Sequence, residues 1–192
     1  GQAAIGRFGW KAGQPGVDTQ TAAAFNGDLG ITSPIFGEVE LTPAQAELAK
    51  LPHGGEPEVE EKLFNAIVFY ARTLAVPARR NPDDPQVLAG EQVFAQIGCA
   101  SCHTPTHTTP SDSTFPELSE QTFAPYTDLL LHDLGPKLAD GFGAAEGREW
   151  RTPPLWGIGL IKVVNGHQEL LHDGRARGVP ASSRLAQFTV DE

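Results

Sequence analysis

The sequence predicts a mainly α-helical fold with long irregular loops. Two stretches, residues 57–74 and 84–98, carry apolar side chains at helical spacing. Gly and Pro together account for 37 of the 192 residues (21 Gly and 16 Pro), so turns and loops must take a large share of the chain. Ten Phe, three Trp and two Tyr give the fold enough apolar surface to form a core.

The first third of the chain is expected to be irregular apart from short helices. Residues 1–35 show no sustained period, and a short helix is expected over 19–25. Thr42 and Pro43 resemble an N-cap followed by Pro at the first helical position, which predicts a second short helix ending near Lys50. The sequence His53-Gly54-Gly55 then interrupts regular structure.

The first long helix is predicted over residues 57–74. Its apolar stripe recurs every three or four residues, at Val59, Leu63, Ile67, Ala71 and Leu74. Phe64 and Val68 widen this stripe, and Pro77 ends the pattern.

The second long helix leads directly to the two cysteines of the chain. Asp84 is the expected N-cap, and Pro85 occupies the first helical position. The apolar side chains are Val87, Leu88, Val93, Phe94 and Ile97. Gly98 ends the helix immediately before Cys99.

Charge and hydropathy exclude two classes of protein. The net charge of −10 argues against a nucleic-acid-binding protein, which needs a cationic surface. No apolar run is long enough to span a bilayer. The sequence contains no Met, so residue 1 is not a translation start and the chain is expected to be processed or part of a longer protein.

Residues 99–103, Cys-Ala-Ser-Cys-His, form a C-x-x-C-H motif. This is the attachment signature of c-type haem, because two thiols at this spacing each form a thioether with one vinyl group of the same porphyrin. The adjacent His103 then becomes the proximal iron ligand. The motif therefore predicts a cytochrome c-type haem domain with one covalent haem.

Three other interpretations of the cysteines remain open. Zinc needs four ligands, and only His107 is close enough in sequence to assist the pair. A redox dithiol would need a βαβ setting, and no alternating strand and helix pattern surrounds the motif. A structural disulfide would leave His103 without a role. Gly90 and Phe94, one turn apart on the helix before the motif, favour haem, because cytochrome c domains use such a pair for close helix crossing and packing at the haem edge.

Six segments together resemble the di-haem oxidoreductase family, whose members are often labelled thiol oxidoreductases and are related to di-haem cytochrome c peroxidases and MauG. The segments are residues 6–12, 74–80, 99–105, 126–133, 149–157 and 171–177. The resemblance implies that the chain is the C-terminal haem half of such a protein. It also implies a second haem domain or a redox partner protein, and a periplasmic or extracellular location. We expect residues 1–80 to form an N-terminal segment whose long helix packs on the haem domain, and residues 81–192 to form that domain.

The C-terminal tail departs from the family. Residues 178–192 hold no Met, His or Tyr that could cap the iron, so the haem domain is expected to be truncated or altered there. Without Met, a sixth protein ligand must be His, Tyr, Lys or a terminal group, or the site is open. His132 and His172 lie in family segments that line the haem pocket, and either is a candidate substitute ligand.

The resemblance supplies further candidates for haem binding. Arg151 is suited to pairing with a propionate. Pro154, or its neighbour Pro153, is a candidate for packing on the haem. Trp156, like Trp10 and Trp150, is a candidate electron relay or core residue. The expected function is electron transfer by a c-type haem as part of a peroxidase-like oxidoreductase, and the alternatives are a stand-alone mono-haem module or a zinc-binding module.

Overall fold

The structure of the chain is a computed structural model that describes residues 3–112, 114–141 and 147–180. It divides into two compact units, the first comprising residues 1–9 and 14–74 and the second residues 10–13 and 75–192. Helix accounts for 38% of the described residues and strand for 9%. The prediction of a mainly α fold is therefore confirmed only in part, because the Thr-, Pro- and Gly-rich connections form short strand pairs and make the fold mixed.

The first unit packs α1 (Val17–Leu29) against α2 (Glu61–Thr73), with the 3-10 helix η1 (Pro43–Lys50) between them in the chain. Its core consists of Ala22, Val59, Phe64 and Val68, surrounded by Phe25, Ile31 and Phe36. The rings of Phe25 and Phe64 lie 6.5 Å apart and join the two helices. The short helix predicted at 19–25 is thus longer, and the one predicted from Pro43 is a 3-10 helix.

The apolar stripe predicted over residues 57–74 is confirmed in part, because Val59, Phe64 and Val68 are buried but the edge through Leu63 and Leu74 is exposed. Phe64 and Val68 are buried, at 3% and 7% exposure, whereas Leu63 and Leu74 are each 57% exposed. The helix begins four residues later than predicted, at Glu61. The Glu58 carboxylate accepts hydrogen bonds from the backbone N–H groups of Gly54 and Thr32, which holds this segment outside the helix.

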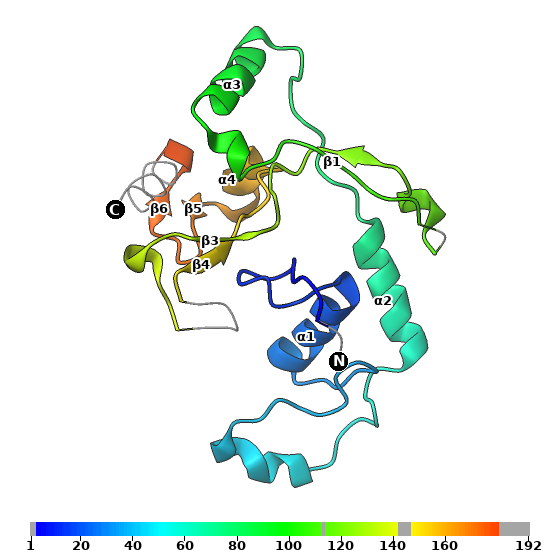
Figure 1. Cartoon of the computed structure of the whole chain (residues 1–192). Helices are drawn as coiled ribbons and strands as arrows, with labels where there is room; N and C mark the ends of the chain where they lie inside the picture. Colours follow the sequence, from blue (N-terminus) through cyan, green and yellow to red (C-terminus); the bar gives the residue numbers. More distant parts are fainter. Residues whose placement is uncertain (1–2, 113, 142–146, 181–192) are drawn as a thin grey trace. The chain divides into compact units, whose positions relative to one another are not determined.

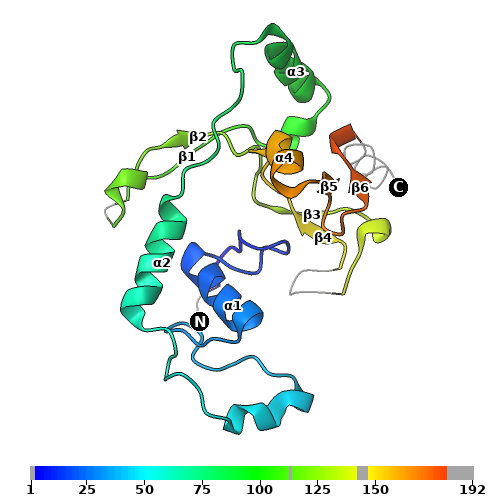
Figure 2. The same ribbon diagram turned by 180° about the vertical axis from the view of Figure 1, so that it is seen from behind.

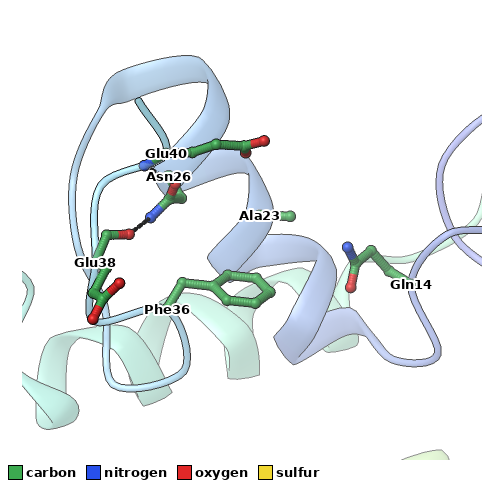
Figure 3. A pocket seen from close by; sticks show the side chains of 6 residues that line it. All are labelled: Gln14, Ala23, Asn26, Phe36, Glu38 and Glu40. Atoms are coloured by element: carbon green, nitrogen blue, oxygen red, sulfur yellow. Dashed lines mark hydrogen bonds between the residues drawn. The ribbon is translucent and has the colours of Figure 1, made fainter. Parts of the chain in front are cut away.

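Asn26 fixes the connection that follows α1. Its side-chain amide donates to the Glu38 carbonyl at 2.6 Å and its oxygen accepts from the Glu40 N–H at 3.0 Å. Figure 3 shows the open pocket beside these groups, a cavity of about 250 Å³. It is lined by Gln14, Ala23, Asn26, Phe36, Glu38 and Glu40. None of the residues predicted to bind haem lines it.

In its described residues, the second unit combines short helices with three two-stranded antiparallel sheets, and both views show them as short strands among loops (Figures 1 and 2). Its α-helices are α3 (Pro85–Gln96) and α4 (Ile161–Asn165), and its 3-10 helices are η2 (Cys99–Ser101), η3 (Pro116–Leu118), η4 (Pro136–Leu138) and η5 (Ile158–Leu160). The strand pairs are β1 (His107–Thr108) with β2 (Thr122–Phe123), β3 (Leu131–Asp133) with β4 (Glu149–Arg151), and β5 (Glu169–Leu170) with β6 (Ala176–Arg177).

The structure confirms the predicted start of α3, and the helix ends at Gln96, two residues before Gly98. An Asp84 carboxylate oxygen accepts from the Gln86 N–H at 2.8 Å, and Pro85 is the first helical residue. Gly98 follows the helix with a φ of 86°, a conformation that favours glycine. The side chains of Leu88, Val93 and Ile97 are 45%, 50% and 61% exposed. Among the described residues, these three side chains therefore leave apolar surface of α3 exposed.

Trp150 and Leu138 form the buried centre of the β3–β4 region, at 6% and 1% exposure. The Trp150 indole N–H donates to the Leu138 carbonyl at 2.9 Å, so the polar edge of the ring is satisfied inside the unit. Most of the C-terminal tail that was expected to be altered, residues 181–192, lies outside the described residues. Within the described ranges, no helix is long and apolar enough to cross a membrane.

Candidate functional site

The C-x-x-C-H motif forms a tight turn directly after α3. The 3-10 helix η2 begins at Cys99, and the His103 N–H donates to the Cys99 carbonyl at 3.0 Å. Both Cys99 and Cys102 are free thiols and half-buried. The structure therefore forms no disulfide between them, and both sulfur atoms remain available for other chemistry.

The imidazole of His103 is held by a backbone carbonyl. Its Nδ1 lies 2.9 Å from the Tyr126 carbonyl oxygen, so Nδ1 carries the proton and donates it. The lone pair is then on Nε2, which is the arrangement that a metal-ligating histidine needs, because the second ring nitrogen fixes tautomer and orientation.

The ring of Phe94, two residues before the end of α3, lies 6.3 Å from the His103 ring. The same ring meets Tyr126 edge-on at 5.6 Å. Phe94 thus touches both the imidazole and the residue whose carbonyl holds it. The structure brings this predicted residue to the motif.

The segment from Pro125 to Leu130 wraps around the motif through backbone hydrogen bonds. The Thr127 N–H donates to the Thr104 carbonyl at 3.0 Å, and the Asp128 N–H donates to the Cys102 carbonyl at 2.9 Å. Tyr126 and Leu129 have φ angles of 54° and 59°, which residues other than glycine adopt only when their surroundings hold them.

Thr127 is the centre of this wrapping segment. Its side chain is fully buried, and its hydroxyl donates to the Thr152 carbonyl at 2.6 Å while accepting from the Leu129 N–H at 2.9 Å. Its own carbonyl accepts from the Nε2 of His107 at 2.7 Å. One residue therefore connects the motif, the segment before β3 and the segment after β4.

His132, on β3, lies between a sulfur and a carboxylate. Its Nδ1 is 3.8 Å from the Cys102 sulfur, and its Nε2 is 2.7 Å from an Asp128 carboxylate oxygen. The three side chains are half-buried and offer ligand atoms within 4.8 Å of one another. His107, the residue that sequence spacing favoured as a zinc ligand, is outside this group.

The carboxyl of Asp128 is ionised at neutral pH. Burial raises its pKa, but hydrogen bonds from the Leu130 N–H, His132 and the Thr152 side chain lower it by more, so its pKa is below the usual value. An ionised carboxylate beside Nε2 keeps a proton on that nitrogen and leaves the lone pair of His132 on Nδ1, toward Cys102.

Arg151 is on the same strand pair as His132 but on the other face. His132 is paired with Trp150 and Arg151 with Leu131, and side chains of successive strand residues point to opposite faces. Burial lowers the pKa of the Arg151 guanidinium, which stays charged at neutral pH. The structure thus separates Arg151 from the group around Cys102.

His172 is held against Trp150. The two rings are stacked with their centroids 3.6 Å apart and an angle of 19° between their planes. The Lys11 ammonium lies 3.5 Å from the Trp150 centroid and pairs with Asp140 at 2.9 Å. Because both groups cannot occupy one face at these distances, Trp150 is sandwiched between them.

Burial is the main cause that lowers the pKa of His172 below its usual 6.5. Arg175 and Lys11 lower it further, while Asp173 and Asp140 oppose the shift. The ring is therefore neutral at neutral pH. No described contact joins His172 to Cys99, Cys102 or His103.

Trp156 and Pro154 follow β4. Trp156 is 38% exposed, and its ring lies 6.4 Å from that of Phe123, which in turn is 6.3 Å from His107. Pro154 is half-buried. This aromatic row approaches the wrapping segment through His107, which donates to the Thr127 carbonyl.

Sequence reasoning missed three residues that shape the site: Tyr126, Thr127 and Asp128. One signal was available for Asp128, because it precedes His132 by four residues and the three residues between them are Leu. The roles of Tyr126 and Thr127 depend on backbone conformation, for which the local sequence carries no clear signal.

Comparison with known proteins identifies the family. Neither the curated proteins nor the solved structures include a significant match to the chain. The family model described as "di-haem oxidoreductase, putative peroxidase" matches residues 2–182. This match covers nearly the whole sequence and agrees with the resemblance of the six segments. The chain belongs to the di-haem oxidoreductase family.

Proposed function

We propose that the chain carries one haem c, attached through Cys99 and Cys102 with His103 as proximal iron ligand, and transfers electrons within a peroxidase-like di-haem oxidoreductase. The observation that carries this proposal is the C-x-x-C-H turn with two free thiols and an imidazole already held through Nδ1. The family name implies haem, and the motif specifies covalent attachment.

The residues present fit a haem. Each vinyl thioether uses one thiol, and the turn offers two. The Tyr126 carbonyl accepts the Nδ1 proton of His103, which leaves Nε2 as the ligand atom. The exposed side chains of Val93 and Ile97 lie four residues apart at the end of α3 next to the motif, and a porphyrin needs apolar contacts.

A haem bound here supplies an iron centre that gains or loses one electron. His103 would hold the iron on the proximal side, and Phe94 would exclude water from the imidazole. Arg151, Pro154 and Trp156 remain candidates for propionate pairing and packing.

For the sixth position we propose an open or weakly capped iron. The His132 ring already contacts Cys102 and Asp128, and the His172 ring stacks on Trp150. Each ring would have to give up these contacts to bind the iron. These contacts favour the open alternative over capping by either histidine.

We further propose a periplasmic or extracellular location and a second haem domain, or a separate redox partner protein, as the electron donor or acceptor. The chain contains one C-x-x-C-H motif. By itself it is therefore expected to change oxidation state reversibly with little peroxide turnover, as a mono-haem module would.

The test is a pyridine haemochrome assay on the chain produced with a c-type haem maturation system, after acid-acetone extraction. One haem that stays with the polypeptide is expected. His103→Ala should abolish the low-spin or proximal-histidine spectrum, whereas His107→Ala, whose ring bonds the same wrapping segment, should retain it. Extraction of all the haem, or equal effects of the two variants, would contradict the proposal.

A further inference from the structure

The cluster of Cys102, Asp128 and His132 contains three kinds of metal-binding group in one place. We infer that the haem-free chain binds one zinc ion between the Cys102 sulfur and Nδ1 of His132, with Asp128 orienting the imidazole, and that haem attachment and zinc binding exclude each other. The site stands on these side chains alone and would exist even if the proposed function failed.

The separation of the two ligand atoms fits zinc. Zinc bonds sulfur at about 2.3 Å and histidine nitrogen at about 2.0–2.1 Å, so a tetrahedral angle places the two ligand atoms about 3.6 Å apart. The structure places them 3.8 Å apart. An ion that binds to one side of the line joining the two atoms therefore fits with a movement of a few tenths of an ångström, because both side chains are only half-buried.

Asp128 gives the histidine the orientation that a metal site needs. A ligating histidine usually donates its other ring N–H to a carboxylate or a carbonyl. Here Nε2 faces the Asp128 oxygen at 2.7 Å, which leaves the lone pair of Nδ1 toward Cys102. The Asp128 side chain is 13% exposed and its second oxygen accepts from the Leu130 N–H, so the carboxylate is itself fixed.

The backbone holds the ligands together although they are 30 residues apart in the sequence. The Asp128 N–H donates to the Cys102 carbonyl at 2.9 Å, which ties the start of the wrapping segment to the motif. His132 is fixed by the pairing of β3 with β4. Water, or the thiol of Cys99 after a local movement, can complete the coordination.

Haem attachment consumes the same sulfur. In thioether formation the Cys102 S–H adds across a vinyl C=C bond. The sulfur bonds one carbon and the proton bonds the other, so the addition needs no oxidant or reductant. A zinc ion on Cys102 must leave before this reaction, and the thioether then has no thiolate to offer the metal. Zinc is therefore expected to slow haem attachment.

The first experiment titrates the haem-free full chain, produced without a haem maturation system, with zinc against a chromophoric chelator, and with cobalt(II) as a spectroscopic probe. We expect one ion per chain and a thiolate-to-cobalt charge-transfer band. Cys102→Ser should remove the band, and His132→Gln should weaken binding at least tenfold. Asp128→Asn, which retains the bond to Leu130, should weaken it about tenfold.

His107→Gln is the matched control and should bind zinc within about twofold of the parent chain. Circular dichroism of each variant separates loss of a ligand from loss of the fold, and the cobalt band reports sulfur ligation directly. No zinc binding, or equal losses for His132→Gln and His107→Gln in folded variants, would overturn the inference. Cobalt ligation that persists after covalent haem attachment would overturn the exclusion.

Failure here is distinct from failure of the proposed function. Haem stoichiometry is measured on the chain matured with haem, whereas metal binding is measured on the haem-free chain. A protein that attaches haem but never binds zinc would refute only the inference, and one that binds zinc but never attaches haem would refute only the proposed function.

Discussion

Replacing Thr127 with Val tests whether the wrapping segment holds the cysteine motif in place. The substitution keeps the shape of the side chain but removes its hydroxyl, so it is not a conservative change. The fully buried hydroxyl bonds the Thr152 carbonyl and the Leu129 N–H. Thr152 is itself only 6% exposed, whereas Leu129 is half-buried.

The expected cost follows from these two orphaned groups. A buried group left without its partner costs about 1–3 kcal/mol, and the half-buried Leu129 N–H can recover part of its loss from water. We expect Thr127→Val to lower the free energy of unfolding by about 2 kcal/mol, which for a chain of this size lowers the Tm by about 4–8 °C.

Urea unfolding and thermal melts followed by circular dichroism would measure the change. Amide hydrogen exchange would locate it at Leu129. Thr108→Val is the control, because within the described part of the chain that exposed hydroxyl bonds only Thr122. An effect within about 0.5 kcal/mol is expected. Equal stability of the two variants, together with unchanged exchange at Leu129, would refute the role given to Thr127.

Two further predictions concern the histidines. The pKa of His172 is lowered in the folded chain, so the unfolded state binds the proton more tightly. The neutral ring contributes its full stability at pH values above the unfolded pKa of about 6.5. This contribution is lost as the pH falls through the folded pKa. An NMR titration should show this ring titrating below 6.5, and His172→Gln should flatten the fall in stability as the pH drops below about 6.5. A ring that titrates above 6.5 would contradict the burial argument. For the haem-loaded chain, we expect rapid carbon monoxide binding to the ferrous form, with similar rates in His132→Gln and His172→Gln. A low-spin spectrum that resists carbon monoxide in the parent chain and yields to it in one variant would identify that histidine as the cap.

The parts of this protein that were predictable are those encoded by adjacent residues. Asp84 is the N-cap of α3 and Pro85 is its first residue, and Gly98 lies two residues after its last residue. The C-x-x-C-H motif names its own thiols and histidine because haem chemistry fixes their spacing. Each of these features needs only one short stretch of chain.

Which side of the apolar face of α2 is buried was not predictable in the same way. Its sequence offers two adjacent apolar stripes, one through Leu63 and Ile67 and one through Phe64 and Val68. The aromatic contact of Phe64 with Phe25 on α1 selects the second stripe. Periodicity gives the existence of an apolar face, but the partner helix determines which face is buried.

The surroundings of the motif depend on contacts across 20 to 30 residues. His132 meets Cys102, and Thr127 meets Thr152, in a segment where Tyr126 and Leu129 adopt positive φ angles. The residue types do not predict these positive φ angles, since neither position is Gly or Asn. The same limit explains why His107 rather than His132 stood out as the partner of the cysteines.

The motif and the helix before it are stabilised in different ways, and this difference would affect the attachment of haem. The backbone of Tyr126, Thr127 and Asp128 hydrogen-bonds the His103 ring and the carbonyls of Thr104 and Cys102, which fixes the imidazole and the backbone of the motif without any cofactor. The apolar side chains of Val93 and Ile97, by contrast, are 50% and 61% exposed. A polar network therefore sets the positions of the imidazole and the motif backbone in advance, and the apolar contacts remain to be made. Attachment would then gain hydrophobic free energy on α3 while the geometry of the motif changes little.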